Sequence, residues 1–126
     1  MKDTLSGMTV LVVDDDLDTL VLFEAVLRSS GADVIAAQSA RDAVSLYRRH
    51  RPAVVVSDIA MPHEDGYWLV KELASDAARV IAVTGHGDTH PPQRTRAAGF
   101  LAHLRKPVEP DALCALVAQV ARQRDA

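Results

Sequence analysis

The stretch VVVSDIAMPHEDG, residues 54–66, begins with a continuous run of β-branched residues and then changes abruptly to an aspartate and a polar loop. A strand in which every residue is apolar is buried on both faces, as the strands of a parallel sheet are. Other short runs share or approach this character: Thr9–Val13, Asp33–Ala37, 80–83 and 101–104. The sequence therefore predicts five parallel strands.

Amphipathic segments separate these runs and predict five helices. Leu17, Leu20 and Val21 belong to the first helix, which Gly31 closes as a C-terminal glycine. Ser39 is the expected N-cap of the second helix. The remaining helices are expected over 68–73, from Pro91 and Pro92 to just before Gly99, and over 109–122. Strict alternation of strands and helices predicts an α/β fold with helices on both faces of the sheet.

Length and composition favour one domain of the α/β class. The chain has 126 residues, and aromatic residues make up only 4% of them, so Val, Leu, Ile and Ala must form the core. We expect residues 1–126 to form a single domain with a loose polar tail over 1–7. Cys114 is expected to be a buried, inert thiol, because one cysteine cannot form an internal disulfide and it has no evident reactive partner.

The charge and hydropathy patterns argue against nucleic-acid and membrane functions. The net charge is −3, and the one basic run, residues 48–51, suits the C-terminus of a helix without any ligand. No signal peptide is evident, and no apolar run approaches the roughly 20 residues that a membrane span needs. We therefore expect a cytoplasmic protein that binds neither nucleic acid nor membrane.

Polar side chains follow the predicted strands at the points where the strands end. Asp14 and Asp15 follow the first strand, Asp58 the third and Thr84 the fourth, and Lys106 stands just beyond the fifth. Because the carboxyl ends of parallel strands meet at one edge of a sheet, these groups are expected to share a cleft. Each alone has an ordinary structural reading, such as helix capping, and only their conjunction points to a site.

The expected grouping has a chemical logic. Neighbouring carboxylates raise one another's pKa values, and a hard divalent cation relieves their repulsion. Oxygen ligands suit magnesium, and an ionised aspartate beside it can attack phosphorus as a nucleophile. The magnesium, Lys106 and the Thr84 hydroxyl could then stabilise charge on the phosphoryl oxygens.

The sequence resembles the receiver domain of response regulators in two-component signalling, and in particular the chemotaxis regulators. The resemblance rests on motifs spread over nearly the whole chain: VLVVDDD at 10–16, VVVSDIAMPHEDG at 54–66, VIAVTG at 80–85 and HLRKP at 103–107. It implies a flavodoxin-like, doubly wound (βα)5 fold with strand order 2-1-3-4-5.

The resemblance also assigns roles by position. Asp58 would be the phosphoacceptor. Asp15 would ligate Mg2+ directly, Asp14 mostly through water, and the backbone carbonyl of Ala60 would be a further ligand. Lys106 would contact the phosphoryl oxygens, and the Lys106–Pro107 bond would be cis.

The switch is expected to follow from Thr84, whose hydroxyl would move onto the phosphoryl group. His103 stands where many receivers carry Tyr or Phe as a rotating switch residue, although a strand residue at a wet sheet edge is an equal reading. The side chains of Ala60 and His86 would flank the hydrolytic water and set the lifetime of the phosphoryl group. Gly66 would allow a positive φ in the loop after the acceptor.

The implied phosphoryl donor is a phosphohistidine on a sensor histidine kinase or a phosphotransfer protein. The implied output surface comprises the fourth helix, fifth strand and fifth helix, which would bind a downstream protein partner, act on an output domain or form a homodimer. The domain would assist its own phosphorylation and dephosphorylation without being an enzyme in the usual sense. Its place as a stand-alone receiver or as part of a hybrid kinase stays open.

Two other functions fit parts of the pattern. A phosphatase of the haloacid dehalogenase type also carries D-x-D after its first strand, as Asp14 and Asp16 do, but Asp18 stands where Thr or Val is expected. A receiver that acts only as a phosphorylation-independent interaction module usually lacks one of the acidic, Thr or Lys positions. Here all of these positions are present.

Overall fold

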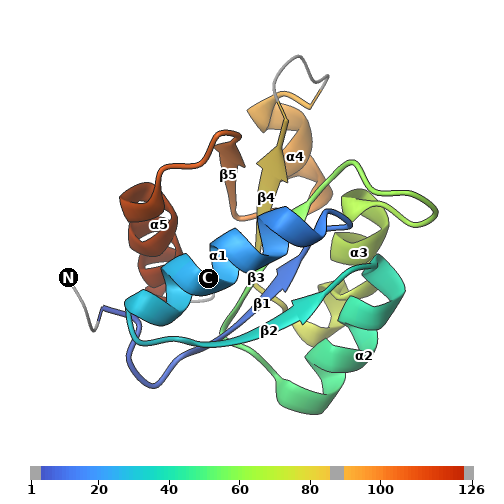
Figure 1. Cartoon of the computed structure of the whole chain (residues 1–126). Coiled ribbons are helices and arrows are strands. Elements are labelled where there is room, and N and C mark those ends of the chain that lie inside the picture. The colour runs from blue at the N-terminus through green and yellow to red at the C-terminus, as the bar shows by residue number, and fades with distance from the viewer. Residues whose placement is uncertain (1–3, 86–89, 124–126) are drawn as a thin grey trace.

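A single five-stranded parallel sheet, in the order β2-β1-β3-β4-β5, organises the chain (Figure 1). The computed structural model describes residues 4–85 and 90–123. The strands are β1 Thr9–Val13, β2 Asp33–Ala37, β3 Val54–Asp58, β4 Val80–Thr84 and β5 Ala102–Arg105. The predicted flavodoxin-like α/β fold and its strand order are confirmed.

Helices cover both faces of the sheet. They are α1 Leu17–Ser29, α2 Ala40–His50, α3 Gly66–Glu72, α4 Pro92–Ala98 and α5 Pro110–Arg122, with a 3-10 turn η1 Ala74–Asp76 after α3. Helices α1 and α5 contact each other on one face, whereas α3 contacts both α2 and α4 on the other (Figure 1). This is the doubly wound arrangement that strict alternation predicts.

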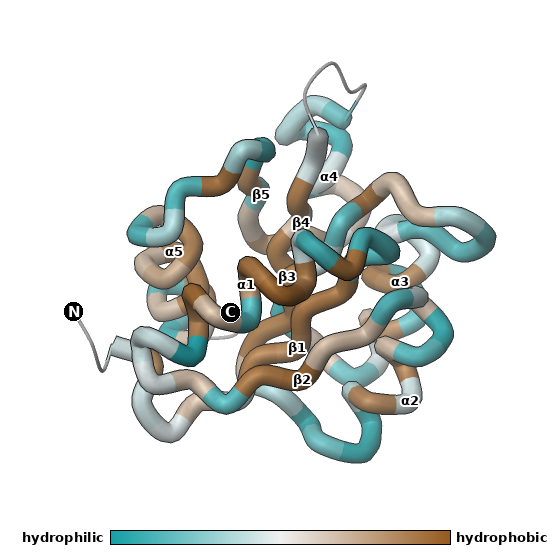
Figure 2. The backbone as a smooth tube through the Cα atoms, viewed as in Figure 1, coloured by the Kyte–Doolittle hydropathy of each residue, from teal (hydrophilic) through white to brown (hydrophobic). Residues whose placement is uncertain are grey.

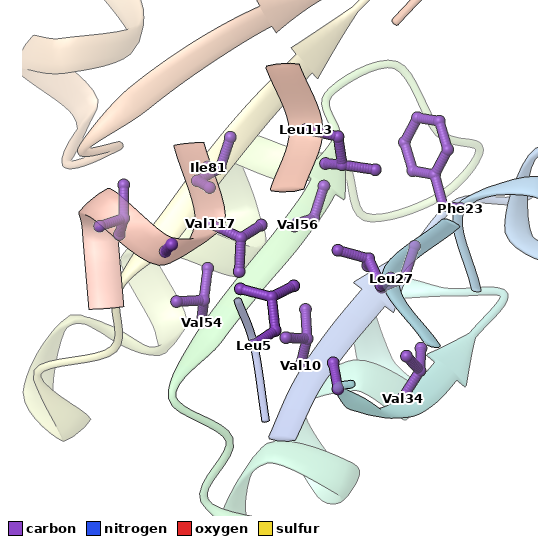
Figure 3. Close-up of a cluster of buried hydrophobic side chains, with 14 of the residues drawn as sticks. Leu5, Val10, Phe23, Leu27, Val34, Val54, Val56, Ile81, Leu113 and Val117 are labelled. Carbon is purple, nitrogen blue, oxygen red and sulfur yellow. The ribbon is translucent and has the colours of Figure 1, made fainter. Parts of the chain in front are cut away.

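Two apolar clusters, one on each face, form the core. The first packs α1 and α5 onto the sheet through residues such as Val10, Val56, Leu27 and Val117 (Figure 3). The second packs α2 and α3 on the opposite face. Figure 2 shows the central strands β1 and β3 as the brown, hydrophobic centre of the molecule. Strands buried on both faces explain why their sequences are continuously apolar.

Several predicted boundaries shift by a residue or two. Strand β3 continues through Ser57 and Asp58, and β5 begins and ends one residue later than predicted. Helix α3 begins at Gly66 because the Asp65 carboxylate caps it, accepting a hydrogen bond from the Trp68 N–H at 2.9 Å. Apolar periodicity alone does not predict these boundaries, because strands can end on polar residues and helices can begin before their first apolar residue.

The expectation of a loose tail over 1–7 is wrong for residues 4–7. Leu5 is 0% exposed and lies among Val10, Val54 and Val117 in the first cluster (Figure 3). Its N–H donates to the Ser30 carbonyl at 2.8 Å, which ties the segment to the end of α1. A single leucine among polar residues gives no periodic signal. Residues 1–3 lie outside the described part of the chain.

Other minor features mostly follow the sequence analysis. The basic run at the C-terminal end of α2 has a structural role, since Arg48 and Arg51 both form ion pairs with Asp76. Cys114 is partly rather than fully buried, at the edge of the first cluster. Across residues 4–85 and 90–123, no helix has the length and apolar character required to cross a membrane.

Replacing the buried N-terminal leucine should destabilise the domain. Leu5→Ala removes a fully buried side chain from the first cluster, so the free energy of unfolding should fall by about 2–4 kcal/mol in urea titrations. Leu22→Ala is the matched control, because Leu22 is 56% exposed on α1 and its loss should change the same quantity by less than about 0.5 kcal/mol. Equal effects of the two substitutions would contradict the packing of Leu5.

Candidate functional site

The carboxyl ends of neighbouring strands bring the predicted site residues together. Strands β1, β3 and β4 are adjacent in the sheet, so Asp14, Asp58 and Thr84 follow or end strands that lie side by side. Lys106 comes from beyond β5 and reaches across this edge. Its Nζ lies 3.0 Å from Asp14 Oδ2 and 3.7 Å from Asp58 Oδ2. Segments nearly the whole chain apart thus meet as predicted.

The three predicted acidic residues form one cluster. Asp14, Asp15 and Asp58 each offer a carboxylate oxygen, and these oxygens lie within 4.8 Å of one another. Asp14 is 2% exposed and Asp58 is 8% exposed, whereas Asp15 is open to solvent. Asp14 Oδ1 also accepts the Asp16 N–H at 2.9 Å, which fixes its orientation. The cluster therefore has two buried members and one exposed member.

Burial and the mutual repulsion of the carboxylates both change the pKa of Asp58. Burial and the negative charge of Asp14 raise the pKa of Asp58 from 3.8 to about 6, against the opposing pull of Lys106. Burial disfavours the Lys106 ammonium, but the hydrogen bond to Asp14 and the charge of Asp58 outweigh it and raise the pKa of Lys106. Lys106 therefore stays charged, whereas Asp58 loses its proton at a higher pH than an ordinary aspartate.

A divalent cation fits this donor set. Carboxylate oxygens at this spacing, with one member open to solvent, match the preference of Mg2+ for a few carboxylates and several waters. The Ala60 N–H donates to the Asp58 carboxylate, so the loop that carries the expected Ala60 carbonyl ligand lies directly beside the cluster. The acidic cluster is therefore suited to a magnesium ion.

Asp16 stands apart from the cluster. It occupies the N-cap position of α1, is exposed, and its Oδ2 accepts the Thr19 hydroxyl at 2.7 Å. That hydrogen bond lowers the pKa of Asp16. The second carboxylate of a D-x-D pair thus belongs to a helix terminus, while the adjacent Asp15 joins Asp14. This arrangement weakens the phosphatase alternative.

The role predicted for Gly66 needs correction. Its φ is not in the positive region, and the residue with positive φ in this loop is His63, at 65°. Gly66 is required for space: a Cβ there would lie 2.7 Å from the Asp58 carbonyl oxygen and 2.8 Å from the Ile59 Cα. Because α3 begins against the backbone of the acceptor strand, only glycine fits at this position.

Thr84 and His103 are in direct contact. Thr84 Oγ1 lies 2.8 Å from His103 Nε2, and on its other side His103 Nδ1 lies 3.4 Å from the Thr95 hydroxyl of α4. In the sequence, only the resemblance links Thr84 with His103, and no pattern points to Thr95. The signal for Thr95 was weak, because a threonine in an exposed, polar helix has no apolar period to mark it.

Two further expectations concern the same edge. The Lys106–Pro107 peptide bond is cis, as expected. His86 lies outside the described residues, so its predicted place beside the hydrolytic water stays a prediction.

The raised pKa of Asp58 predicts a pH-dependent gain in stability on neutralising it. Between pH 3.8 and about 6 the folded protein holds a proton that the unfolded chain releases, so the free energy of unfolding falls as pH rises over this range, and the loss is complete above about pH 6. In metal-free buffer, Asp58→Asn should therefore raise the free energy of unfolding by about 1–3 kcal/mol at pH 7.5.

The same gain should disappear below about pH 3, where the aspartate is neutral in both states. Urea titrations across this pH range measure it, and Asp33→Asn, on the exposed start of β2, is the control that should show no such trend. A gain independent of pH would contradict the electrostatic cause.

Comparisons with known proteins agree with this geometry. The chain is 42% identical over 120 residues to an "uncharacterized 14.6 kDa protein in sodA1 3'region" of Leptolyngbya boryana, and the match covers 92% of both sequences. It is 36% identical over 123 residues to the response regulator Rre1 of Synechocystis, a match that covers 93% of this chain and 53% of that protein. The chain thus spans nearly all of one relative and about half of the other.

A solved structure shows the same architecture. The chemotaxis protein CheY4 of Vibrio cholerae superposes with a TM-score of 0.82 at 26% identity, covering 90% of this chain and 98% of that one. The family described as "Response regulator receiver domain" matches residues 10–118, a span that contains Asp14, Asp15, Asp58 and Lys106. The chain therefore belongs to the response regulator receiver domain family of two-component signalling.

Proposed function

We propose that the chain is a phosphoacceptor receiver that takes a phosphoryl group on Asp58 in the presence of Mg2+. The observation that carries this proposal is the meeting of Asp58 with two further carboxylates within 4.8 Å and with the Lys106 ammonium at 3.7 Å. A purely structural role at this edge of the sheet would not explain why three carboxylates and an ammonium lie together. The proposal takes residues 1–126 as one such domain.

The residues of the cluster divide the chemistry among them. An oxygen of the ionised Asp58 attacks the phosphorus of the donor; an O–P bond forms while the P–N bond of a phosphohistidine breaks, and the imidazole leaves with the bonding electron pair. Asp14, Asp15, Asp58 and the Ala60 carbonyl would hold Mg2+, which when bound neutralises the carboxylates and the phosphoryl oxygens. Lys106 and the Thr84 hydroxyl then contact those oxygens.

The donor is proposed to be a sensor histidine kinase or a histidine phosphotransfer protein. Such a partner must bring its histidine to Asp58, beside which α1 begins. Helix α1 carries three exposed large apolar side chains, Leu17, Val21 and Leu22. Exposed apolar side chains on one helix suit contact with a protein partner. The proposed location is the cytoplasm.

The signal is proposed to leave through α4, β5 and α5. A cavity of about 730 Å³ on this surface is lined by apolar residues such as Leu101 and Leu116 and by Arg96 and Arg105. None of the described residues that line it carries a carboxylate. An acidic segment of a downstream protein or output domain would therefore suit this surface, and a homodimer through the same surface is the alternative.

The proposed domain catalyses changes only on itself. It assists its own phosphorylation and later hydrolysis and turns over no free substrate. A phosphorylation-independent interaction module would have no need for Asp58 to stay in a buried site that raises its pKa. A phosphatase of the haloacid dehalogenase type would need Asp16 in the cluster, where Asp15 stands instead.

Acetyl phosphate should label the protein on Asp58. Incubation with acetyl phosphate and MgCl2 should add the mass of one phosphoryl group in intact-mass spectra. Acetyl phosphate acts here as the phosphoryl donor in place of a phosphohistidine. EDTA should abolish the gain, since the cation neutralises the carboxylates around the attacking oxygen. Asp58→Asn should show no gain, whereas the control Asp33→Asn should be labelled like the wild type.

Two outcomes would count against the assignment. Retained labelling of Asp58→Asn would move the acceptor elsewhere. Failure of the wild type to take up either acetyl phosphate or beryllofluoride with Mg2+ would favour the phosphorylation-independent module.

Lys106→Ala should slow phosphorylation without unfolding the domain. The substitution removes the cation that lies 3.0 Å from Asp14 and 3.7 Å from Asp58, so the phosphoryl oxygens lose one charged partner. Loss of one such partner typically lowers a rate by about 10²–10³-fold. Labelling rates with acetyl phosphate measure the effect, and circular dichroism checks the fold. Arg79→Ala removes a cation that bonds the Gln123 carbonyl, away from the cluster, and should leave the rate unchanged.

A further inference from the structure

His103 lies between two threonine hydroxyls from different elements. Its Nε2 is 2.8 Å from Thr84 Oγ1 at the end of β4, and its Nδ1 is 3.4 Å from Thr95 Oγ1 on α4. Both ring nitrogens are therefore engaged. A tyrosine or phenylalanine at this position could not hold the two hydroxyls in this way, so the histidine gives this chain a contact that an aromatic switch residue lacks.

The register of the sheet explains the contact. His103 of β5 pairs with Ala82 of β4. Two residues further along the two strands, Arg105 pairs with Thr84. Side chains at i and i+2 of a strand share a face, so Thr84 and Ala82 point to the same side as His103. Ala82 belongs to the cluster under α2 and α3, and α4 lies beside α3 on that face. His103 thus links the end of β4 to α4.

Counting protons fixes the direction of each hydrogen bond. The Thr95 hydroxyl has one proton and lies 3.1 Å from the Pro92 carbonyl, which can only accept. Toward His103 the same hydroxyl oxygen must then accept, so Nδ1 carries the proton. In the neutral ring Nε2 is consequently bare. It accepts the proton of the Thr84 hydroxyl. Among the residues that the structure describes, the other acceptor for this hydroxyl, the Leu104 carbonyl, is farther away at 3.5 Å.

While the Thr84 hydroxyl donates its proton to His103 Nε2, it cannot donate a hydrogen bond to a phosphoryl oxygen. A hydroxyl that donates to His103 presents only lone pairs elsewhere, and lone pairs repel phosphoryl oxygens. If Nε2 gains a proton, it becomes a donor to Thr84 Oγ1. The contact between the two residues persists while its direction reverses, and the Thr84 proton is released to donate elsewhere.

Two arginines lie on the same surface as His103. Arg96 of α4 and Arg105 of β5 line the same cavity, as does His90, and α5 contributes the uncharged Gln119 and Leu116. The acidic cluster at the same edge of the sheet carries Asp14, Asp15 and Asp58, whose charges Lys106 cancels only in part. Two arginines oppose a further cation. A phosphoryl group on Asp58 adds about −1.5 to −2 charges to this edge and favours one.

We propose that His103 is a positioning residue that controls the direction of the Thr84 hydroxyl, and that it takes up one proton from solvent when Asp58 is phosphorylated. The inference depends on the proposed function. No bond other than N–H forms: the proton comes from water to Nε2, and the Thr84 proton turns from Nε2 to a phosphoryl oxygen. Because Thr95 holds the other nitrogen, the change reaches α4 directly.

The first test measures the ring of His103 by 15N NMR, with His103→Gln used to assign its signals. In the metal-free protein at pH 8 we expect the neutral tautomer with its proton on Nδ1. Adding beryllofluoride with Mg2+, a phosphoryl mimic, should raise the pKa of His103 by about 1 or more. A resting tautomer with the proton on Nε2 would overturn the proposal without any ligand.

The second test separates this inference from the proposed function. If beryllofluoride binds but the pKa of His103 stays the same, the inference fails while the phosphoacceptor function stands. If beryllofluoride does not bind at all, the proposed function fails and the switching part of the inference fails with it. Thr95→Val should remove the preference for the Nδ1 proton, and a wild-type tautomer in that variant would contradict the role of Thr95.

A pH profile tests the coupling thermodynamically. The ratio of beryllofluoride affinities, wild type over His103→Gln, cancels the protonation of Asp58, which both proteins share. This ratio should rise as pH falls through the pKa of His103, by about 10-fold for each pKa unit gained on binding. A flat ratio between pH 5 and 8 would show that His103 has no proton-linked part in the switch.

Discussion

The repulsion among three carboxylates, held at one edge of a sheet that cannot relax, is the constraint on which the rest of this domain depends. Asp14, Asp15 and Asp58 meet within 4.8 Å because the strands that carry the first and last of them are neighbours. The core on both faces of the sheet fixes those strands, so the charges cannot separate. What relieves the repulsion must come from outside the cluster: the Lys106 ammonium, a proton or a divalent cation.

Because of that constraint, the charged edge of the sheet lowers stability, while the apolar core supplies it. The site raises the pKa of Asp58 to about 6, which means that the folded state is strained at neutral pH when no cation is present. The strain is local, because the apolar strands and the buried residues of α1 and α5 contribute far more to stability. A charged edge on a well-packed sheet can therefore undergo a change of charge without loss of the fold.

Sequence reasoning recovered the fold because its signals are repetitive. Continuously apolar strands and amphipathic helices each occupy many residues, and the site residues sit at the ends of those strands, where position alone identifies them. Single-residue features were harder to predict. Leu5 fills the core without any period around it, and Gly66 is needed for its lack of a Cβ against Asp58. Thr95 acts through a hydrogen bond that only tertiary packing creates.

The His103 contact shows how the same edge can carry a signal beyond its charges. A hydroxyl has one proton, so Thr84 cannot donate to His103 and to a phosphoryl oxygen at once. The choice between these acceptors is a two-state event, and His103 transmits it to α4 through Thr95. The cavity between α4, β5 and α5 has His103 in its wall beside Arg96 and Arg105. A change of one proton on that ring therefore alters both the phosphoryl site and the charge of the surface proposed to meet an acidic partner.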